Sequence, residues 1–374
     1  MPRAAGLLLA LLTVLTPAAP ARSGPPDRRV YPLQGGEARV PVPAGTEGSL
    51  WRVQDEAGRP VRAWGPTDAD GGVRVPRGGW YRLSRREPGG DEATVGGRFA
   101  AGFVVVLTGQ SQADSFFRSD NPAVGAFPAG PGDPPPPLVA AWLLDCTGAP
   151  GCGPGGAAWA APGDGLGARV LMAELARRLG PVPLALANAA WGGAGIAELA
   201  DPETPAGGRL LRVARAAAPA SAALVLAHGV TDARRGTPPG DYAASLARVV
   251  GVLRADALRD GAPVLLAPLP PMRGPTRLLG SGTLAGWLLP KEGAPTWALR
   301  WGLASAEPLP APTAARAEAI RAAQAGATAG LGLLPGGDMA AAEPGLDGVH
   351  WARGAVRRAA REAAEALARA LPPP

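Results

Sequence analysis

Lysine, histidine and cysteine are scarce in this chain. Its 374 residues include two histidines, two cysteines and a single lysine, Lys291, so nearly all of the positive charge is arginine. The arginines are scattered in short pairs such as Arg85 with Arg86, and charged residues make up 18% of the chain. Proteins that bind nucleic acid usually cluster their basic residues among aromatic ones. We therefore expect a solvated, generally basic surface, in keeping with the net charge of +6, and no nucleic-acid partner.

Few residues are suited to hold a metal ion or a phosphate. The two histidines, His228 and His350, lie in separate segments without a dense cluster of carboxylates, so the usual zinc ligand set is missing. The glycine-rich residues 192–195 lack the lysine and the spacing of a phosphate-binding loop. Ser111 is not framed by the Gly-x-Ser-x-Gly pattern of α/β-hydrolases. We expect neither a metal nor a cofactor.

Glycine and proline, by contrast, are abundant, with 54 and 44 residues. They follow no fixed period, which excludes collagen-like and solenoid folds. Because 47% of the residues are hydrophobic, the chain has ample material for a buried core. We therefore assign the glycines and prolines to turns and loops.

The first residues have the pattern of an export signal. Arg3 supplies a positive charge, residues 7–15 form a short apolar run, and Ala19-Pro20-Ala21 fits a cleavage site between small residues. The apolar run is too short to span a bilayer comfortably, and no later stretch is typical of a transmembrane helix. We expect residues 1–21 to be a signal peptide cleaved near Ala21. The mature protein would then be periplasmic or secreted, without stable membrane insertion.

The two cysteines, Cys146 and Cys152, lie close together in a short segment rich in turn residues. In an oxidising compartment two such thiols pair readily, so we expect a disulfide that stiffens this loop.

Residues 22–97 have the pattern of a small β-rich domain. Short apolar stretches at 38–42, 50–53 and 80–83 alternate with turns, and no helical period is present. Such a domain either binds a carbohydrate or serves as a packing or spacer module, and the sequence favours the second role.

From residue 98 onward, apolar strands alternate with amphipathic helices, which indicates a parallel sheet covered on both sides. We therefore predict an α/β fold for residues 98–371, a three-layer sandwich around a five-stranded, mostly parallel sheet. The expected strands are 103–107, 182–187, 222–227, 263–269 and 331–334, and the expected helices are 166–179, 242–258, 314–329 and 351–371. Two long segments, 119–165 and 272–312, interrupt this rhythm as functional loops or as loosely ordered decoration.

Polar or glycine-rich segments follow the expected strands. They are residues 108–112, 188–196 and 228–232, and a fourth segment, 347–350, precedes the last helix. Open α/β sheets bind their ligands beyond the carboxyl ends of the strands, so we expect these segments to meet at one edge of the sheet.

Ser111, His350 and Asp347 have the chemistry of a nucleophilic site. A serine hydroxyl needs a nearby base, because it is almost wholly protonated at neutral pH. The base in turn needs a carboxylate that fixes its tautomer and stabilises its charge. Asp347 and His350, three residues apart at the start of a helix, could serve as orienting group and base. Taken alone, however, such a pair is more often an ordinary polar helix entry.

Taken together, the four segments resemble the sequence blocks of the SGNH (GDSL-like) hydrolases, specifically the sialate O-acetylesterase-like carbohydrate esterases. The family blocks read Gly-Gln-Ser-Asn, Asn-x-x-x-Gly-Gly-Thr-x-Ile-x-x-Trp, Gln-Gly-Glu-x-Asp-Ala and Asp-Gly-x-His. The matching segments here are 109–112, 188–199, 228–233 and 347–350. Their order and spacing agree over residues 98–371. The chain departs from the first block at Gln112, from the second at Ala194 and Leu199, and most of all from the third, where His228 replaces the glutamine.

The resemblance implies a role for each site residue. Ser111 would be the nucleophile, His350 the general base and then acid, and Asp347 the group that orients His350. The oxyanion hole would consist of the backbone N–H groups of Ser111 and Gly192 and a side chain from the third block, either His228 or Thr231. Residues Gln110, Gln112 and Gly193 would contact the substrate.

These roles imply a secreted or periplasmic serine esterase that removes acetyl or other short acyl groups from carbohydrate hydroxyls. Its partner would be an acylated carbohydrate. Two alternatives stay open: a carbohydrate-binding protein on an inactive esterase scaffold, and an O-acyltransferase that uses the same three residues.

Overall fold

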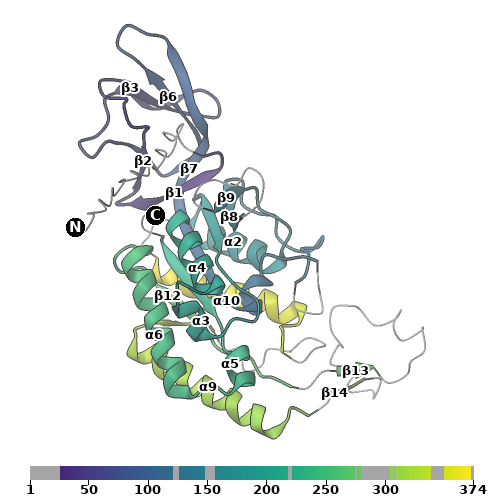
Figure 1. The fold of residues 1–374 in the computed structure, drawn as a ribbon. Coiled ribbons are helices and arrows are strands. Elements are labelled where there is room, and N and C mark those ends of the chain that lie inside the picture. The colour runs from purple at the N-terminus through teal and green to yellow at the C-terminus, as the bar shows by residue number, and fades with distance from the viewer. Residues whose placement is uncertain are drawn as a thin grey trace, which may run out of the picture.

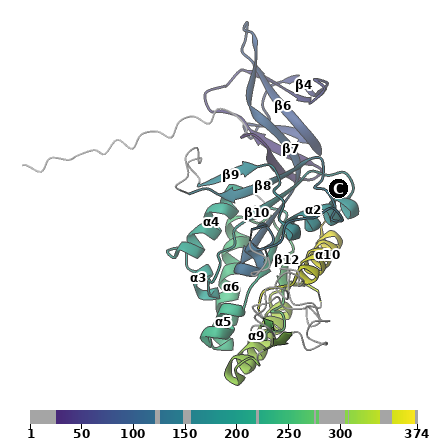
Figure 2. The same cartoon turned by 90° about the vertical axis from the view of Figure 1, so that its right-hand side faces the viewer.

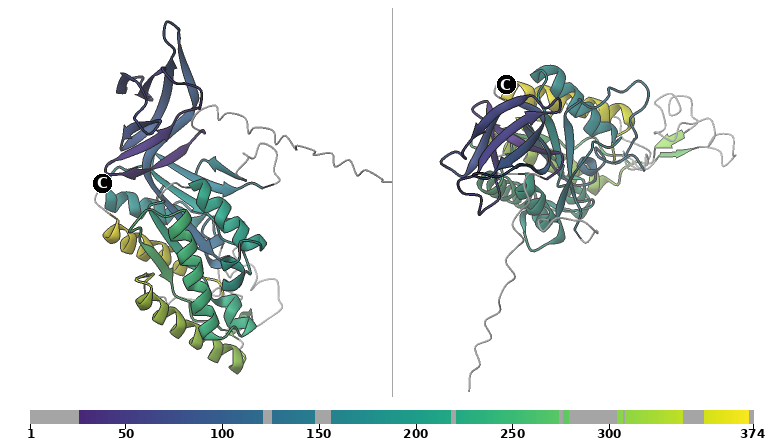
Figure 3. Two further views of the ribbon diagram at one scale, coloured as in Figure 1. Left: turned by 60° about the vertical axis from the view of Figure 1, so that its left-hand side comes forward. Right: turned by 90° about the horizontal axis from the view of Figure 1, so that it is seen from above.

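The computed structural model describes residues 26–120, 126–147, 156–217, 221–273, 276–278, 304–306, 308–337 and 349–371. The described chain forms an elongated molecule in which a β-rich region is stacked on an α/β region (Figures 1 and 3). The expected signal peptide, residues 1–21, lies outside the described residues. None of the described helices is long and apolar enough to cross a bilayer.

The β-rich region consists of short antiparallel strands around an apolar centre. Its strands are β1 (Arg29–Gln34), β2 (Glu37–Pro41), β3 (Leu50–Asp55), β4 (Pro60–Gly65), β5 (Gly72–Pro76) and β6 (Gly78–Arg86). Alternate residues of β2 and β3 are buried, as expected for strands with one face on the core. Trp51, Val53 and Leu83 are fully buried and belong to this core.

Strand β7 (Glu92–Gly109) links the two regions. Its first half pairs antiparallel with β6, and its second half lies parallel to the strands on either side of it in the α/β region. Exposed and half-buried residues change to a fully buried run at Phe99. The expected domain boundary between residues 97 and 98 therefore lies inside one continuous strand, and the division into two domains stays a prediction.

The sheet of the α/β region has more strands than the sequence predicts. Among the described residues it follows the order β9-β8-β10-β7-β11-β12-β15, parallel throughout except between β8 and β9. Besides β7, its strands are β8 (Ala140–Asp145), β9 (Ala157–Ala160), β10 (Leu184–Asn188), β11 (Ala223–Ala227), β12 (Val264–Ala267) and β15 (Leu334–Pro335). The predicted five-stranded sheet is therefore wrong. Strands β8 and β9 fall within residues 119–165, where the surrounding prolines and glycines favoured a loop.

Helices cover both faces of this sheet (Figure 2). One face carries α2 (Leu166–Leu179) and α10 (Arg353–Ala370). The other carries α3 (Ile196–Ala200), α4 (Pro205–Ala217), α5 (Val230–Arg235), α6 (Pro239–Asp256) and α9 (Ala311–Gly330). Phe103, Val105 and Leu107 of β7 pack toward the first group, and Val104 and Val106 toward the second. The strand is thus buried on both faces, which explains its continuous apolar sequence.

Sequence periodicity predicts α2, α6, α9 and α10, each within three residues at either end, but not α4. Helix α2 spans the expected residues 166–179, buries Leu171, Leu175 and Leu179, and stops at Gly180, whose φ is 79°. A small antiparallel pair, β13 (Thr276–Leu278) and β14 (Ala304–Ala306), lies apart from the main sheet (Figure 1).

Candidate active site

Ser111 lies at the carboxyl end of the central strand. Strand β7 ends at Gly109, and Ser111 begins the short helix α1 (Ser111–Asp114). Gly109 has a φ of 127°, and a Cβ atom there would lie 2.0 Å from the carbonyl oxygen of Ala227, so this turn requires glycine. As the first residue of a helix, Ser111 has a backbone N–H without an intrahelical acceptor.

His350 faces this serine from the other end of the chain. Its Nε2 atom lies 2.7 Å from Ser111 Oγ, across 239 residues of sequence. The neighbours of His350 fix its segment on α1. Val349 O accepts a hydrogen bond of 3.3 Å from Gln112 Nε2, and the Trp351 ring packs edge-on against Phe116 at 5.7 Å. The predicted contact between the serine and the histidine is therefore present, whereas Asp347 lies outside the described residues.

An ion-pair cluster anchors the helix that follows His350. Asp133 accepts hydrogen bonds from Arg357 at 2.7 and 3.0 Å and from Arg353 at 3.2 Å, and its side chain is 3% exposed. The hydrogen bond from Arg357 is the largest of the effects that lower the pKa of Asp133 to about 2. The sequence gives no signal for this cluster, because its members lie more than 200 residues apart.

The second segment packs against the turn that carries Ser111. Asn188 Nδ2 donates a hydrogen bond of 3.2 Å to Asp114 Oδ1, and the Trp191 N–H donates one of 3.0 Å to the carbonyl of Gly109. Gly192 and Gly193 follow and are exposed, with Gly193 at a φ of 77°. The Gly192 N–H makes no hydrogen bond to the described residues, so this donor is open to solvent.

Gln110 and Gln112 are buried instead of facing solvent. They are 1% and 2% exposed, and Gln110 Nε2 donates a hydrogen bond of 2.8 Å to Gln112 Oε1. Gln110 Oε1 in turn accepts a hydrogen bond of 3.2 Å from the Thr231 N–H. Because protein atoms already bind both amides, their position favours a role in holding three segments together over the predicted contact with substrate.

His228 and Thr231, the two predicted donors of the third segment, differ in exposure. The His228 side chain is fully buried, and its Nε2 atom lies 3.0 Å from the carbonyl oxygen of Ala194. Burial lowers the pKa of its imidazole. Thr231 is partly exposed, and its backbone is bound to the residue before Ser111. Of the two, Thr231 is therefore better placed to reach a substrate.

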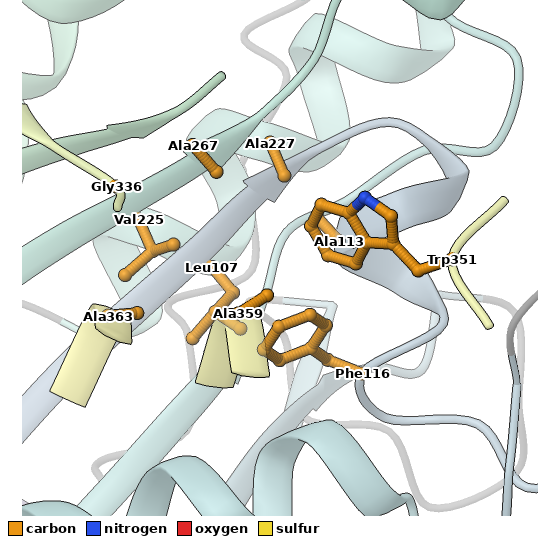
Figure 4. Close-up of a pocket in the computed structure, with 10 residues that line it drawn as sticks. All are labelled: Leu107, Ala113, Phe116, Val225, Ala227, Ala267, Gly336, Trp351, Ala359 and Ala363. Carbon is orange, nitrogen blue, oxygen red and sulfur yellow. The ribbon is translucent and has the colours of Figure 1, made fainter. Parts of the chain in front are cut away.

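A small apolar cavity lies in the core beside Ala113 of α1 and Trp351 (Figure 4). Its volume is about 10 Å³. Leu107, Ala113, Phe116, Val225, Ala227, Ala267, Gly336, Trp351, Ala359 and Ala363 line it. A cavity of this size holds at most one water molecule, and apolar walls keep it dry. It is a gap in the core packing and is too small to hold a sugar ring.

Two further predictions concern the cysteines and metal binding. Cys146 is disulfide-bonded, and Cys152 lies outside the described residues. In the described part of the chain, no group of three or more His, Cys, Asp or Glu side chains is placed to hold a metal ion.

Comparison with known proteins supports the fold. No protein-family model and no curated protein sequence matches the chain. Among solved structures, a carbohydrate acetylesterase from Xanthomonas citri matches with a TM-score of 0.53 and 18% identity, over 94% of this chain and 74% of that one. A carbohydrate acetylesterase from Sinorhizobium meliloti has a TM-score of 0.41 and 13% identity, over 71% and 99%. The M. smegmatis aryl esterase has a TM-score of 0.40 and 12% identity, over 72% and 100%.

The last two matches are too weak to carry an argument, and the first establishes the fold alone. The chain therefore shares the fold of the Xanthomonas citri acetylesterase.

Proposed function

We propose that the protein is a serine esterase that removes acetyl or other short acyl groups from carbohydrate hydroxyls. The observation that carries this proposal is the 2.7 Å contact between His350 Nε2 and Ser111 Oγ at the carboxyl end of the central strand. An imidazole within hydrogen-bond reach of a serine hydroxyl is the arrangement that nucleophilic catalysis requires.

The reaction follows from this geometry. His350 Nε2 takes the proton of Ser111 as Oγ attacks the ester carbonyl, and the same proton then passes to the leaving sugar oxygen. Water attacks the acyl-serine in a second, equivalent cycle and releases the acid. His350 can accept this proton at Nε2 only if its other nitrogen, Nδ1, carries a hydrogen. A carboxylate beside Nδ1, the role we assign to Asp347, would hold that tautomer.

Three donors would stabilise the oxyanion of the tetrahedral intermediates. They are the N–H of Ser111, the N–H of Gly192 and the Thr231 hydroxyl. The first two are free to act, since Ser111 opens a helix and Gly192 is exposed without a hydrogen bond to the described residues. Preorganised donors of this kind give an esterase much of its rate enhancement.

Two observations support a carbohydrate as substrate. The structure that matches with a TM-score of 0.53 is a carbohydrate acetylesterase. In addition, Trp191, the residue before Gly192, is 37% exposed. An exposed indole beside a polar site offers an apolar surface on which one face of a sugar ring can pack. The signal peptide expected at residues 1–21 would export the enzyme to a compartment rich in polysaccharides.

The experiment compares Ser111→Ala with Ser115→Ala on p-nitrophenyl acetate and on an acetylated oligosaccharide. Ser115 is a matched control, because it lies one helical turn away and its hydroxyl bonds to the backbone carbonyl of Gln112 at 2.8 Å. We expect Ser111→Ala to abolish turnover and labelling by a fluorophosphonate, and Ser115→Ala to retain both. Full turnover by Ser111→Ala would reject the proposal.

The departure at His228 favours one second candidate, a carbohydrate-binding protein on an inactive scaffold. That function predicts saturable glycan binding without fluorophosphonate labelling of Ser111, so stoichiometric labelling excludes it. Hydrolysis and acyl transfer differ only in whether water or a sugar hydroxyl attacks the acyl-serine. Analysis of the products with and without a glycan acceptor therefore distinguishes the two reactions.

A further inference from the structure

We propose that His228 and Asp232 are positioning residues, which hold the backbone on both sides of Gly195 and so fix residues 191–196, the segment that carries the Gly192 N–H. The catalytic consequence of this inference rests on the proposed esterase function. The positioning itself does not, because it concerns the conformation of the segment alone.

The contact of His228 with Ala194 is a directed hydrogen bond. A backbone carbonyl oxygen only accepts, so the His228 Nε2 atom, 3.0 Å from Ala194 O, must carry the hydrogen. Burial lowers the pKa of this imidazole, and in either charge state the Nε2 atom that faces the carbonyl carries the hydrogen. The buried ring therefore acts as a fixed donor to the segment.

Asp232 holds the next peptide group along the segment. Its Oδ2 atom accepts a hydrogen bond of 3.2 Å from the N–H of Ile196, and its Oδ1 atom accepts one of 2.9 Å from the Thr237 hydroxyl. The distance from Asp232 Oδ2 to His228 Nδ1 is 3.4 Å, but the geometry makes no hydrogen bond. Asp232 thus holds the start of α3 through the Ile196 N–H.

Arg235 adds a third attachment from the same helix. Its guanidinium donates to the carbonyl oxygen of Gly193 at 3.4 Å and to Glu198 Oε1 at 2.7 Å. The other oxygen of Glu198 accepts a hydrogen bond of 2.8 Å from the Gly195 N–H. The peptide groups between Gly193 and Ile196 are therefore connected to α5 directly or through one side chain.

The support behind His228 is itself rigid. Gln324 Nε2 donates hydrogen bonds of 2.8 Å to the carbonyl of His228 and 2.9 Å to the Tyr242 hydroxyl. The Tyr242 and His228 rings lie 6.0 Å apart and are tilted by 35°. We call the contacts of His228, Asp232 and Arg235 with residues 193–196 the brace. Through Gln324 and Tyr242 this brace is connected to α9 and α6, two long helices of the core.

The segment needs such a brace because its own sequence cannot hold a fixed shape. Residues 192–195 read Gly-Gly-Ala-Gly, and glycine leaves the backbone free to adopt many conformations. A donor acts in an oxyanion hole only if it is already aimed at the position of the developing charge. Residues 228–232 therefore contribute to catalysis mainly through the conformation that they impose on residues 188–196.

A matched pair of variants, His228→Gln and His228→Asn, tests the brace. The glutamine amide nitrogen reaches the place of Nε2 and can donate to Ala194, whereas the asparagine amide is one methylene shorter. We expect His228→Asn to lower kcat about tenfold with KM within about twofold, because a misplaced oxyanion donor weakens the transition state more than the bound substrate. Hydrogen–deuterium exchange in residues 191–196 should also become faster. His228→Gln should restore both quantities to within about threefold of the wild type.

Leu253→Ala controls for a general loss of stability. It opens a cavity in α6 about 16 Å along the helix from Tyr242. Wild-type kcat and wild-type exchange in His228→Asn would overturn the proposal, as would an equal loss of kcat in Leu253→Ala at the same melting temperature. If the wild type hydrolyses no ester, the proposed function fails, and the exchange measurement still decides the positioning role.

Arg235→Leu provides a variant on the exposed side of the same brace, in case His228→Asn does not fold. The Arg235 side chain is 54% exposed, so its loss leaves the core intact. Faster exchange in residues 191–196 supports the brace, and unchanged exchange both here and in Asp232→Ala overturns it.

Discussion

The two histidines of the chain, His228 after β11 and His350 before α10, meet different partners. His350 Nε2 faces a serine hydroxyl at 2.7 Å, and His228 Nε2 faces a backbone carbonyl at 3.0 Å. A hydroxyl can give its proton to an imidazole nitrogen, whereas a carbonyl can only receive a hydrogen bond. The His228 nitrogen must therefore carry a hydrogen, whereas the His350 nitrogen faces a group that can donate one to it. The partner atom, more than the residue type, decides what each ring can do.

The same substitution at both histidines tests this difference most directly. We expect His350→Gln to lower kcat/KM roughly 10⁴-fold, since an amide cannot accept the proton of Ser111, while His228→Gln stays near the wild type. Steady-state kinetics on p-nitrophenyl acetate measure both. An equal loss of kcat/KM in the two variants would contradict the different roles of His350 and His228.

Asp133 anchors α10, the helix that follows His350. Asp133→Asn should lower the free energy of unfolding at pH 7 by about 2 kcal/mol, because it leaves two partly buried arginines without their carboxylate. The carboxylate has a pKa of about 2, below its ordinary value of 3.8. Its contribution is therefore present above pH 3.8 and is lost as the pH falls through 2. Urea unfolding at pH 7 and at pH 2 should show the wild type and the variant converging, and a constant gap would contradict this account.

Thr231 supplies the corresponding test on the His228 side. We expect Thr231→Val to lower kcat about a hundredfold with little change in KM, since it removes one oxyanion donor and keeps the shape of the side chain. Rates with p-nitrophenyl acetate check this value. A variant as active as the wild type would assign the third donor to another group.

Cys146 belongs to neither histidine site, so we expect its substitution to have the smallest effect on catalysis. Opening its disulfide with Cys146→Ser should lower the free energy of unfolding by about 2 kcal/mol, as expected for a short closed loop. We expect kcat to be unchanged. Thermal unfolding and kinetics on the same preparation measure both, and a loss of activity would tie the loop to the site.

The sequence predicts the strand ends from local patterns, and the Ser111–His350 pair from the resemblance of its four segments to known sequence blocks. Apolar runs mark the strands, and parallel strands bring the residues after them to one edge of the sheet. The periodicity of Leu171, Leu175 and Leu179 likewise fixes α2. These features depend on neighbouring residues, so a single sequence is enough to find them.

Other features depend on contacts that no local pattern encodes. The orientation of His228 is set by the carbonyl of Ala194, and the site of Asp133 by arginines more than 200 residues away. Strands β8 and β9 were missed because prolines and glycines flank them, although their register with β10 and with each other is regular. The orienting role of Asp347 stays a prediction.

Strand β7 makes the β-rich region more than an appendage. Its 18 residues extend for about 60 Å, with the hairpin to β6 at one end and the turn to Ser111 at the other. A shortened chain that begins at residue 98 would keep the buried half of this strand and lose the partners of its first residues. We expect such a chain to expose an unpaired edge and to aggregate, so a minimal enzyme engineered from this protein would have to retain residues 26–97.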